Sequence, residues 1–247
     1  MLSSRRSSKR TIEPEFTWTH IKSMNYFTRI VFLSVFLFSI GSSHSFARET
    51  HTLPINPDLI GSGWKMLRFD GIPPSEFIGT KDGILEIRSH KSSSVLYTAV
   101  ADDPIEASTL TWSWHVVEGL PATNLKKAGG DDRVLAIHVV FAEDGMMSRF
   151  KGMFSPFARG RVLTYVWGGH MTDEFPHPHL PESAWMIIRQ PTDAPMNTWI
   201  DETVDLQADY QRVFGSKMPP IAYIGVSGDA DDLGEMCFGM VRNIALN

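Results

Sequence analysis

The chain has 247 residues, of which 43% are hydrophobic, and it carries 23 Lys and Arg against 28 Asp and Glu, a formal net charge of −5. This acidic balance disfavours nucleic acid and anionic membrane surfaces as partners, because like charges repel. The chain has one cysteine, Cys237, so an intrachain disulfide is excluded.

A segment near the N-terminus has the layout of a secretory signal peptide. Read from Met24, it has one positive charge, then the apolar run Ile30–Ile40, then small residues that end at Ala47. Charged, apolar and small residues in this order are typical of a cleaved export signal. We therefore expect residues 1–23 to be a dispensable leader or a misplaced start and residues 24–47 to be a signal peptide. The protein is then periplasmic or secreted.

The remainder, residues 48–247, is expected to form one domain. It retains 17 basic and 26 acidic residues, so its net charge is −9. About 200 residues suffice for one domain with a full core. The apolar run of the signal is too short to span a bilayer, which needs about 20 such residues, so no stable membrane insertion is expected after cleavage.

Apolar and polar residues alternate through most of this domain, with Gly, Pro and Asp between the alternating runs. Such alternation predicts strands. We expect eleven of them: Trp64–Phe69, Glu76–Thr80, Ile84–Ser89, Ser94–Val100, Leu110–Val117, Val134–Phe141, Arg161–Trp167, Ala184–Arg189, Thr198–Val204, Ala222–Gly228 and Phe238–Leu246.

One stretch has helical periodicity instead. Within residues 205–214, Leu206, Tyr210 and Phe214 recur at a spacing of four, and Gly215 supplies a stop. Many short strands with one short helix and no βαβ alternation predict an all-β fold, a single β-sandwich of jelly-roll type.

Several stretches carry a family resemblance. They are Leu110–Trp114 (LTWSW), Lys126–Asp132 (KKAGGDD), Leu163–Trp167 (LTYVW), Ile224–Asp232 and Gly239–Ile244. Together they resemble the DUF3047 family of exported bacterial proteins, over residues 64–247. The resemblance implies an exported β-sandwich and assigns no reaction.

Four aromatic residues are candidates for contact with a sugar ring. Trp112 and Trp114 share one face of their strand with other apolar residues, and this continuous stripe favours a role in the core. Trp167 and Trp185 border a long loop, and we expect them to form an aromatic platform for ligand binding. Tyr165 lies in the same strand as Trp167.

A second interpretation of this region is catalytic. The chain lacks the GxSxG, HExxH, P-loop, GxGxxG and CxxC motifs. A polysaccharide lyase needs a Tyr or His base beside a group that neutralises a uronate, and Tyr165, His138 and Arg189 have that chemistry. Their order in the chain permits this arrangement without requiring it.

Two acidic clusters adjoin glycines at strand ends and are candidates for a structural calcium site. Calcium takes six to eight oxygen ligands, and close carboxylates need a compensating charge. The alternative is turn formation, because Asp and Gly are preferred in turns. Both interpretations remain open for Asp131, Asp132, Asp229, Asp231 and Asp232.

The loop 168–179 adds His170, His177 and His179, a weak signal for a transition metal. The alternative is an exposed loop stiffened by its prolines.

The sequence thus predicts an exported, non-catalytic module that binds carbohydrate or a component of the cell envelope. The alternatives are a polysaccharide-active enzyme, either a lyase or a glycosidase, and a structural interaction protein of the envelope.

Overall fold

The computed structural model describes residues 50–142, 160–170 and 172–247. The predicted leader and signal peptide, residues 1–47, lie outside the described residues, as does the loop segment 143–159. Within the described residues, no helix is long and apolar enough to cross a membrane.

Thirteen strands and one helix are observed among the described residues. The strands are β1 (His51–Thr52), β2 (Lys65–Arg68), β3 (Glu76–Gly79), β4 (Ile84–His90), β5 (Ser93–Ala99), β6 (Thr109–Glu118), β7 (Arg133–Phe141), β8 (Val162–Trp167), β9 (Glu174–Pro176), β10 (Ala184–Gln190), β11 (Ile200–Asp205), β12 (Ile221–Asp229) and β13 (Met236–Leu246); the helix is α2 (Leu206–Phe214).

All eleven predicted strands are confirmed. The two that were not predicted, β1 and β9, have two and three residues, too few for a period of two to be recognised.

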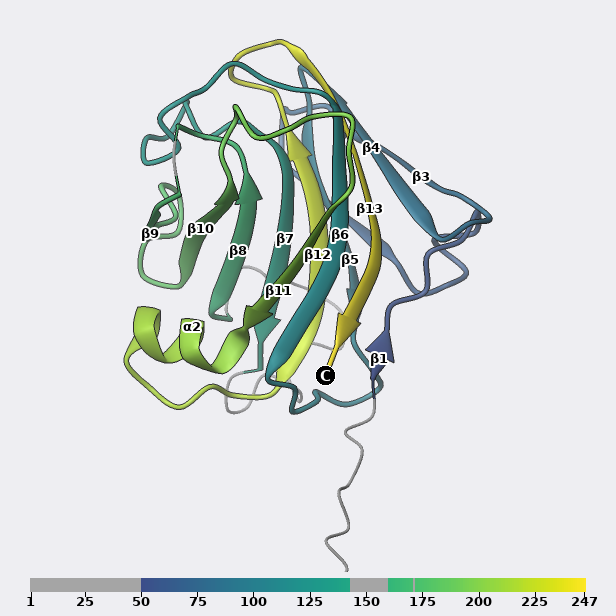
Figure 1. Cartoon of the computed structure of the whole chain (residues 1–247), viewed down its shortest axis with the longest axis vertical. Coiled ribbons are helices and arrows are strands. Elements are labelled where there is room, and N and C mark those ends of the chain that lie inside the picture. The colour runs from purple at the N-terminus through teal and green to yellow at the C-terminus, as the bar shows by residue number, and fades with distance from the viewer. Residues whose placement is uncertain (1–49, 143–159, 171) are drawn as a thin grey trace, which may run out of the picture. The chain divides into compact units, whose positions relative to one another are not determined.

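The strands form two sheets (Figure 1). One has six strands in the order β11-β6-β13-β4-β3, with β1 also paired to β13. The other has seven strands in the order β2-β5-β12-β7-β8-β10-β9. The pairing is antiparallel apart from that of β8 with β10, which is parallel. The chain is thus an all-β sandwich of jelly-roll type, as the sequence predicts.

Aromatic side chains fill the space between the sheets. Trp112 and Trp114 on β6 are 2% and 0% exposed, and their ring centroids lie 5.2 Å apart. Trp112 packs against Tyr165 of β8 at 5.5 Å, and Trp114 packs against Trp167 of β8 at the same distance. The prediction that the Trp112–Trp114 stripe belongs to the core is confirmed.

Helix α2 has the boundaries that its sequence predicts. The side chain of Asp205 caps its N-terminus by accepting a hydrogen bond from the backbone N–H of Ala208 at 2.9 Å. Gly215 ends it in the left-handed conformation, at φ 66°, where a residue without a Cβ is favoured.

An extra residue in β7 decides which face of the seven-stranded sheet Arg133, the first residue of β7, occupies. Ala136 pairs with Ser227, and Arg133 pairs with Asp229, so three steps along β7 match two along β12. This is a β-bulge, which re-aims the side chains beyond it. Val134 and Leu135 both join the core between the sheets, and Arg133 shares the outer face with His138.

Candidate functional site

A pocket of about 550 Å³ lies on the outer face of the seven-stranded sheet and is the candidate site. Strands β2, β5, β12, β7, β8 and β10 all contribute to it, together with the loops beside them. Its apolar wall consists of Leu67, Phe69, Ile72, Val95, Val162, Leu180 and Ala184. Its polar part consists of Ser93, Asp131, Arg133, His138, Thr164, His177, His179, Asp229, Asp231 and Asp232.

A buried ion pair lies in the polar part. The Nη1 atom of Arg133 is 3.1 Å from Oδ2 of Asp229 and donates a hydrogen bond to the backbone carbonyl of Asp131 at 2.7 Å. Among the described residues, Asp229 Oδ1 and Arg133 Nε are buried without a hydrogen-bond partner. Burial raises the pKa of the Asp229 carboxyl well above its usual value, Arg133 opposes this rise, and Asp231 adds to it.

The close approach of Gly228 to the opposite sheet helps to hold Asp229 in place. A Cβ on Gly228 would lie 2.8 Å from Ser89 Oγ and 3.0 Å from both Ile87 Cγ2 and the carbonyl oxygen of Val134. The strand can therefore approach the core here only with glycine, and the next residue, Asp229, lines the pocket on the other face of the sheet.

His138 lies at the floor of the pocket between two hydroxyl groups. Its Nδ1 is 3.1 Å from Thr164 Oγ1 and its Nε2 is 2.9 Å from Ser227 Oγ. Burial lowers the pKa of His138 well below 6.5, and the charge of Arg133 lowers it further. The ring is therefore neutral at physiological pH and supplies hydrogen-bonding capacity without charge.

The two predicted acidic clusters do lie together. Asp132, directly before β7, accepts hydrogen bonds from the backbone N–H groups of Asp232 and Leu233 at 3.3 and 2.7 Å. One ligand atom from each of Asp132, Asp231 and Asp232 falls within 4.8 Å of the others. This spacing fits a cation, and the backbone bonds of Asp132 also fit the turn interpretation, so calcium stays a prediction.

The histidine-rich loop borders the same pocket. His179 Nε2 is 3.4 Å from Asp131 Oδ1, and the rings of His177 and His179 are 5.8 Å apart. Burial lowers the pKa of His177 to about 4, and the nearby Arg133 contributes to this shift. His170 is exposed and does not line the pocket.

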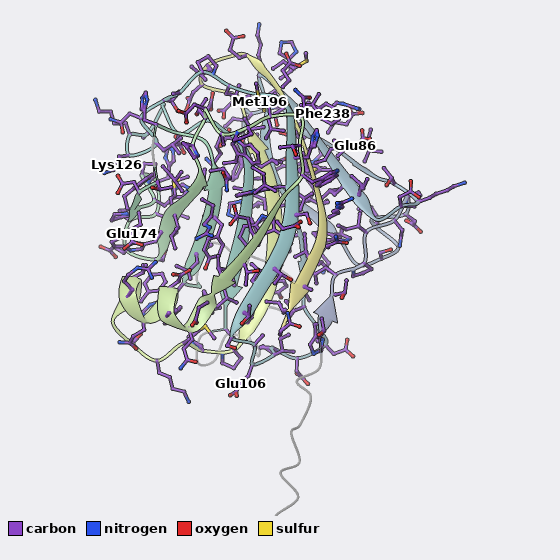
Figure 2. The ribbon with its side chains drawn as sticks, viewed as in Figure 1. Glu86, Glu106, Lys126, Glu174, Met196 and Phe238 are labelled. Carbon is purple, nitrogen blue, oxygen red and sulfur yellow. The ribbon has the colours of Figure 1, made fainter. Side chains whose placement is uncertain are left out.

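The loop between β6 and β7, which includes Asp131, is attached to the β9 edge. Lys126 Nζ is 2.6 Å from Asp173 Oδ2 and 5.4 Å from the ring centroid of Phe175. Figure 2 shows Lys126 and Glu174 on the same side of the molecule. Leu125 is buried in a cluster with Phe175, so the loop is held by both charge and apolar contact.

The structure places the predicted aromatic platform away from the pocket. Tyr165 and Trp167 are 0% and 1% exposed and belong to the core between the sheets. Trp185 pairs with Leu163 and packs on that core as well. These side chains therefore point to the opposite face of the sheet from His138. The platform role predicted for Trp167 and the ligand contact predicted for Tyr165 are therefore wrong, because neither side chain offers surface to a ligand.

The three residues of the alternative, catalytic interpretation do not come together in the structure. Tyr165 donates a hydrogen bond to Asp209 Oδ2 at 2.8 Å, and burial together with Asp209 raises its pKa well above 10, which is the wrong direction for a base. Arg189 pairs with the buried Glu202 through Nε at 3.0 Å and Nη2 at 2.8 Å. Of the three, only His138 lines the pocket.

Sequence reasoning missed Arg133 and Phe69 as pocket residues. Phe69 follows β2 and is 40% exposed. The sequence could have identified it, because it lies two positions after Leu67 and therefore on the same face of the strand. Arg133 carried no such signal, because regular alternation places it on the same face as Leu135, which is in the core.

Comparison with known proteins gives one family and several similar folds. A variant of a family 29 carbohydrate-binding module is similar at 7% identity and TM-score 0.40, over 80% of this chain and 90% of that one. The family 11 carbohydrate-binding module of Clostridium thermocellum, in complex with a β-1,3-1,4-mixed-linked tetrasaccharide, is similar at 9% identity and TM-score 0.40, over 80% and 94%. The xyloglucanase domain of NopAA from Sinorhizobium fredii, in complex with cellobiose, is similar at 9% identity and TM-score 0.43, over 75% and 93%.

These similarities are too distant to carry an argument about the ligand. No curated protein matches the sequence. The model of the DUF3047 family, described as a protein of unknown function, matches residues 62–245. This is most of the chain, and it includes the strands and loops that line the pocket. The chain therefore belongs to the DUF3047 family.

Proposed function

We propose that this protein is an exported, non-catalytic module that binds carbohydrate in the pocket on its seven-stranded sheet. The observation that carries the proposal is the mixed lining of the pocket, which combines exposed and buried apolar side chains with a group of carboxylates. A pyranose has the matching form, since its faces are C–H surfaces and its rim carries hydroxyl groups. The volume of about 550 Å³ is in the range of small-molecule sites.

Phe69 is the proposed contact for a sugar face. It lines the pocket and is 40% exposed, and aromatic rings stack on the apolar faces of sugars through dispersion. Asp231 and Asp232, which are at least partly exposed and line the same pocket, are available to accept hydrogen bonds from ligand hydroxyls. These carboxylates would set the orientation of the ligand, and the apolar side chains would contribute contact area.

A glycan-array screen of the purified protein tests the proposal, followed by calorimetry with the glycans that bind. Phe69→Ala should weaken binding by about tenfold, because it removes a stacking contact. Ile78→Ala is the matched control, since Ile78 is 38% exposed and lies on β3 of the other sheet. Failure to bind any glycan, or equal affinity of the Phe69 variant and the parent, contradicts the proposal.

Export is the second part of the proposal and rests on the pattern of residues 24–47. Cell fractionation followed by N-terminal sequencing should recover a protein that begins at Arg48. Recovery of a chain with intact Met1 from the cytoplasm would contradict export and would leave the binding proposal to its own test.

A further inference from the structure

The charges of the pocket are unbalanced. Among the described lining residues, the acidic ones are Asp131, Asp229, Asp231 and Asp232, and Arg133 is the permanent cation. The positive charge of Arg133 is already engaged by Asp229 and by the carbonyl of Asp131. Arg133 Nη1 also lies 3.7 Å from Oδ2 of Asp131. Among the described residues, Asp231 and Asp232 form no ion pair with a lysine or arginine, so a positively charged group brought by a ligand would offset their repulsion.

Two buried atoms also lack a hydrogen-bond partner, and they differ in what they need. Asp229 Oδ1 is an acceptor, and Arg133 Nε is a donor; among the described residues neither of these atoms makes a hydrogen bond, although the Asp229 carboxyl also interacts with Ser93 and Asp231. The side chains of Asp229 and Arg133 are only 10% and 6% exposed, and both line the pocket. A buried polar atom without a partner costs free energy. A ligand that brings a donor next to an acceptor would satisfy both atoms.

We propose that the pocket selects an amino sugar, with a free ammonium group facing Asp229 and Asp231 and an adjacent hydroxyl oxygen accepting from Arg133. This inference rests on the proposed function, and it names the class of carbohydrate. A vicinal amine and hydroxyl supply the donor and the acceptor side by side. The aspartates disfavour uronates and phosphorylated sugars through like-charge repulsion.

Calorimetry with three tetrasaccharides of one β-1,4 backbone provides the test. They are the glucosamine tetramer, the N-acetylglucosamine tetramer and cellotetraose, which differ at C2 in carrying an ammonium, an acetamido or a hydroxyl group. The glucosamine tetramer should bind about tenfold more tightly than the other two at low salt, and added salt should reduce the preference through screening.

Variants separate recognition in the pocket from general attraction to an acidic protein. Asp231→Asn should abolish the preference, and Asp102→Asn should retain it, because Asp102 is exposed and does not line the pocket. Asp231 is only partly buried, so its variant is expected to fold, and thermal melting verifies this. Asp229→Asn, if folded, should behave as Asp231→Asn does.

Five outcomes overturn the inference. Equal affinity for cellotetraose and the glucosamine tetramer overturns the amino-sugar assignment and leaves carbohydrate binding intact. Equal loss of preference in the Asp102 variant assigns the effect to the net charge of the protein. An alkyl diamine that binds as tightly as the glucosamine tetramer shows that charge alone is recognised. Binding that requires calcium and disappears in EDTA assigns the aspartates to a cation. If none of the three sugars binds and the glycan array also shows no binding, both this inference and the proposed function fail.

Discussion

Arg133 and Asp229 face each other across β7 and β12 on the outer face of the seven-stranded sheet, with Nη1 and Oδ2 3.1 Å apart. Both side chains are almost fully buried, so water screens the ion pair only weakly. A bulge in β7 places the arginine there, and a glycine before Asp229 lets β12 pack closely on the core. The pair thus connects the backbone geometry of two central strands with the polar end of the pocket.

Removal of Arg133 should destabilise the fold. In Arg133→Met the buried Asp229 loses its cation, and breaking a buried pair costs about 3–5 kcal/mol of unfolding free energy. The high pKa of Asp229 lets it bind a proton instead, so we expect the lower end of that range. Urea unfolding measures the effect, with Arg68→Met as the control on an exposed arginine. Similar stability of the two variants would contradict a structural role for the pair.

Trp112→Ala should cost about 3–5 kcal/mol, the usual range for removing a large buried aromatic side chain. Trp112 is 2% exposed and contacts the rings of Trp114 and Tyr165. The control is Met236→Ala, because Met236 is 49% exposed and surface substitutions usually change stability by less than about 0.5 kcal/mol. A melting temperature unchanged in the Trp112 variant would show that this ring does not support the core.

Gly239→Ala should destabilise by about 1–3 kcal/mol through overpacking. A Cβ on Gly239 of β13 would lie 2.6 Å from Cγ of Leu135, which is itself fully buried on the facing sheet. Gly119→Ala is a matched control, since the nearest atom to its Cβ is Sδ of Met196 at 3.1 Å, and Met196 is half-exposed and free to move. Gly239→Ala should therefore have a lower melting temperature than Gly119→Ala. Equal melting temperatures would show that Leu135 can move aside at little cost in stability.

His138 should make stability depend on pH below about 6.5. Burial is the largest reason for its lowered pKa, and Arg133 and His177 add to it. Below about 6.5 the unfolded chain binds a proton that the folded chain does not. The free energy of unfolding then falls by about 1.4 kcal/mol per pH unit for one such proton, until the pH reaches the folded pKa. Above that window the imidazole is neutral in both states and contributes no dependence.

The variant His138→Gln lacks this contribution, so its stability should fall less steeply with acid. His177, whose pKa is about 4, contributes its own slope to parent and variant alike, and the difference between the two proteins isolates His138. Urea unfolding at neutral pH and at about pH 5 measures it. A constant difference in stability across this range would contradict a depressed pKa.

The calcium hypothesis for Asp132, Asp231 and Asp232 makes its own prediction. A cation bound to the folded state alone raises stability by about 2.7 kcal/mol at a hundredfold excess over its dissociation constant. The melting temperature should then be higher with calcium than with EDTA, and this difference should disappear in Asp231→Asn. Equal melting under both conditions would leave the backbone bonds of Asp132 to Asp232 and Leu233 as the account of the cluster.

Local patterns in the sequence predicted the architecture well. Period-two alternation identified each strand of four or more residues, and Asp205 and Gly215 delimited the helix through capping, which depends on neighbours in the chain. The meeting of the acidic clusters was also predictable, because Asp131-Asp132 and Asp229–Asp232 adjoin two core strands. Only the tertiary structure decided which face of the sheet carries the site. Strands β7 and β8 are buried on both faces, so hydrophobicity could not distinguish Trp167, inside the sandwich, from His138, in the pocket. The bulge that brings Arg133 to Asp229 arises from pairing between strands distant in the chain, and no local pattern encodes it.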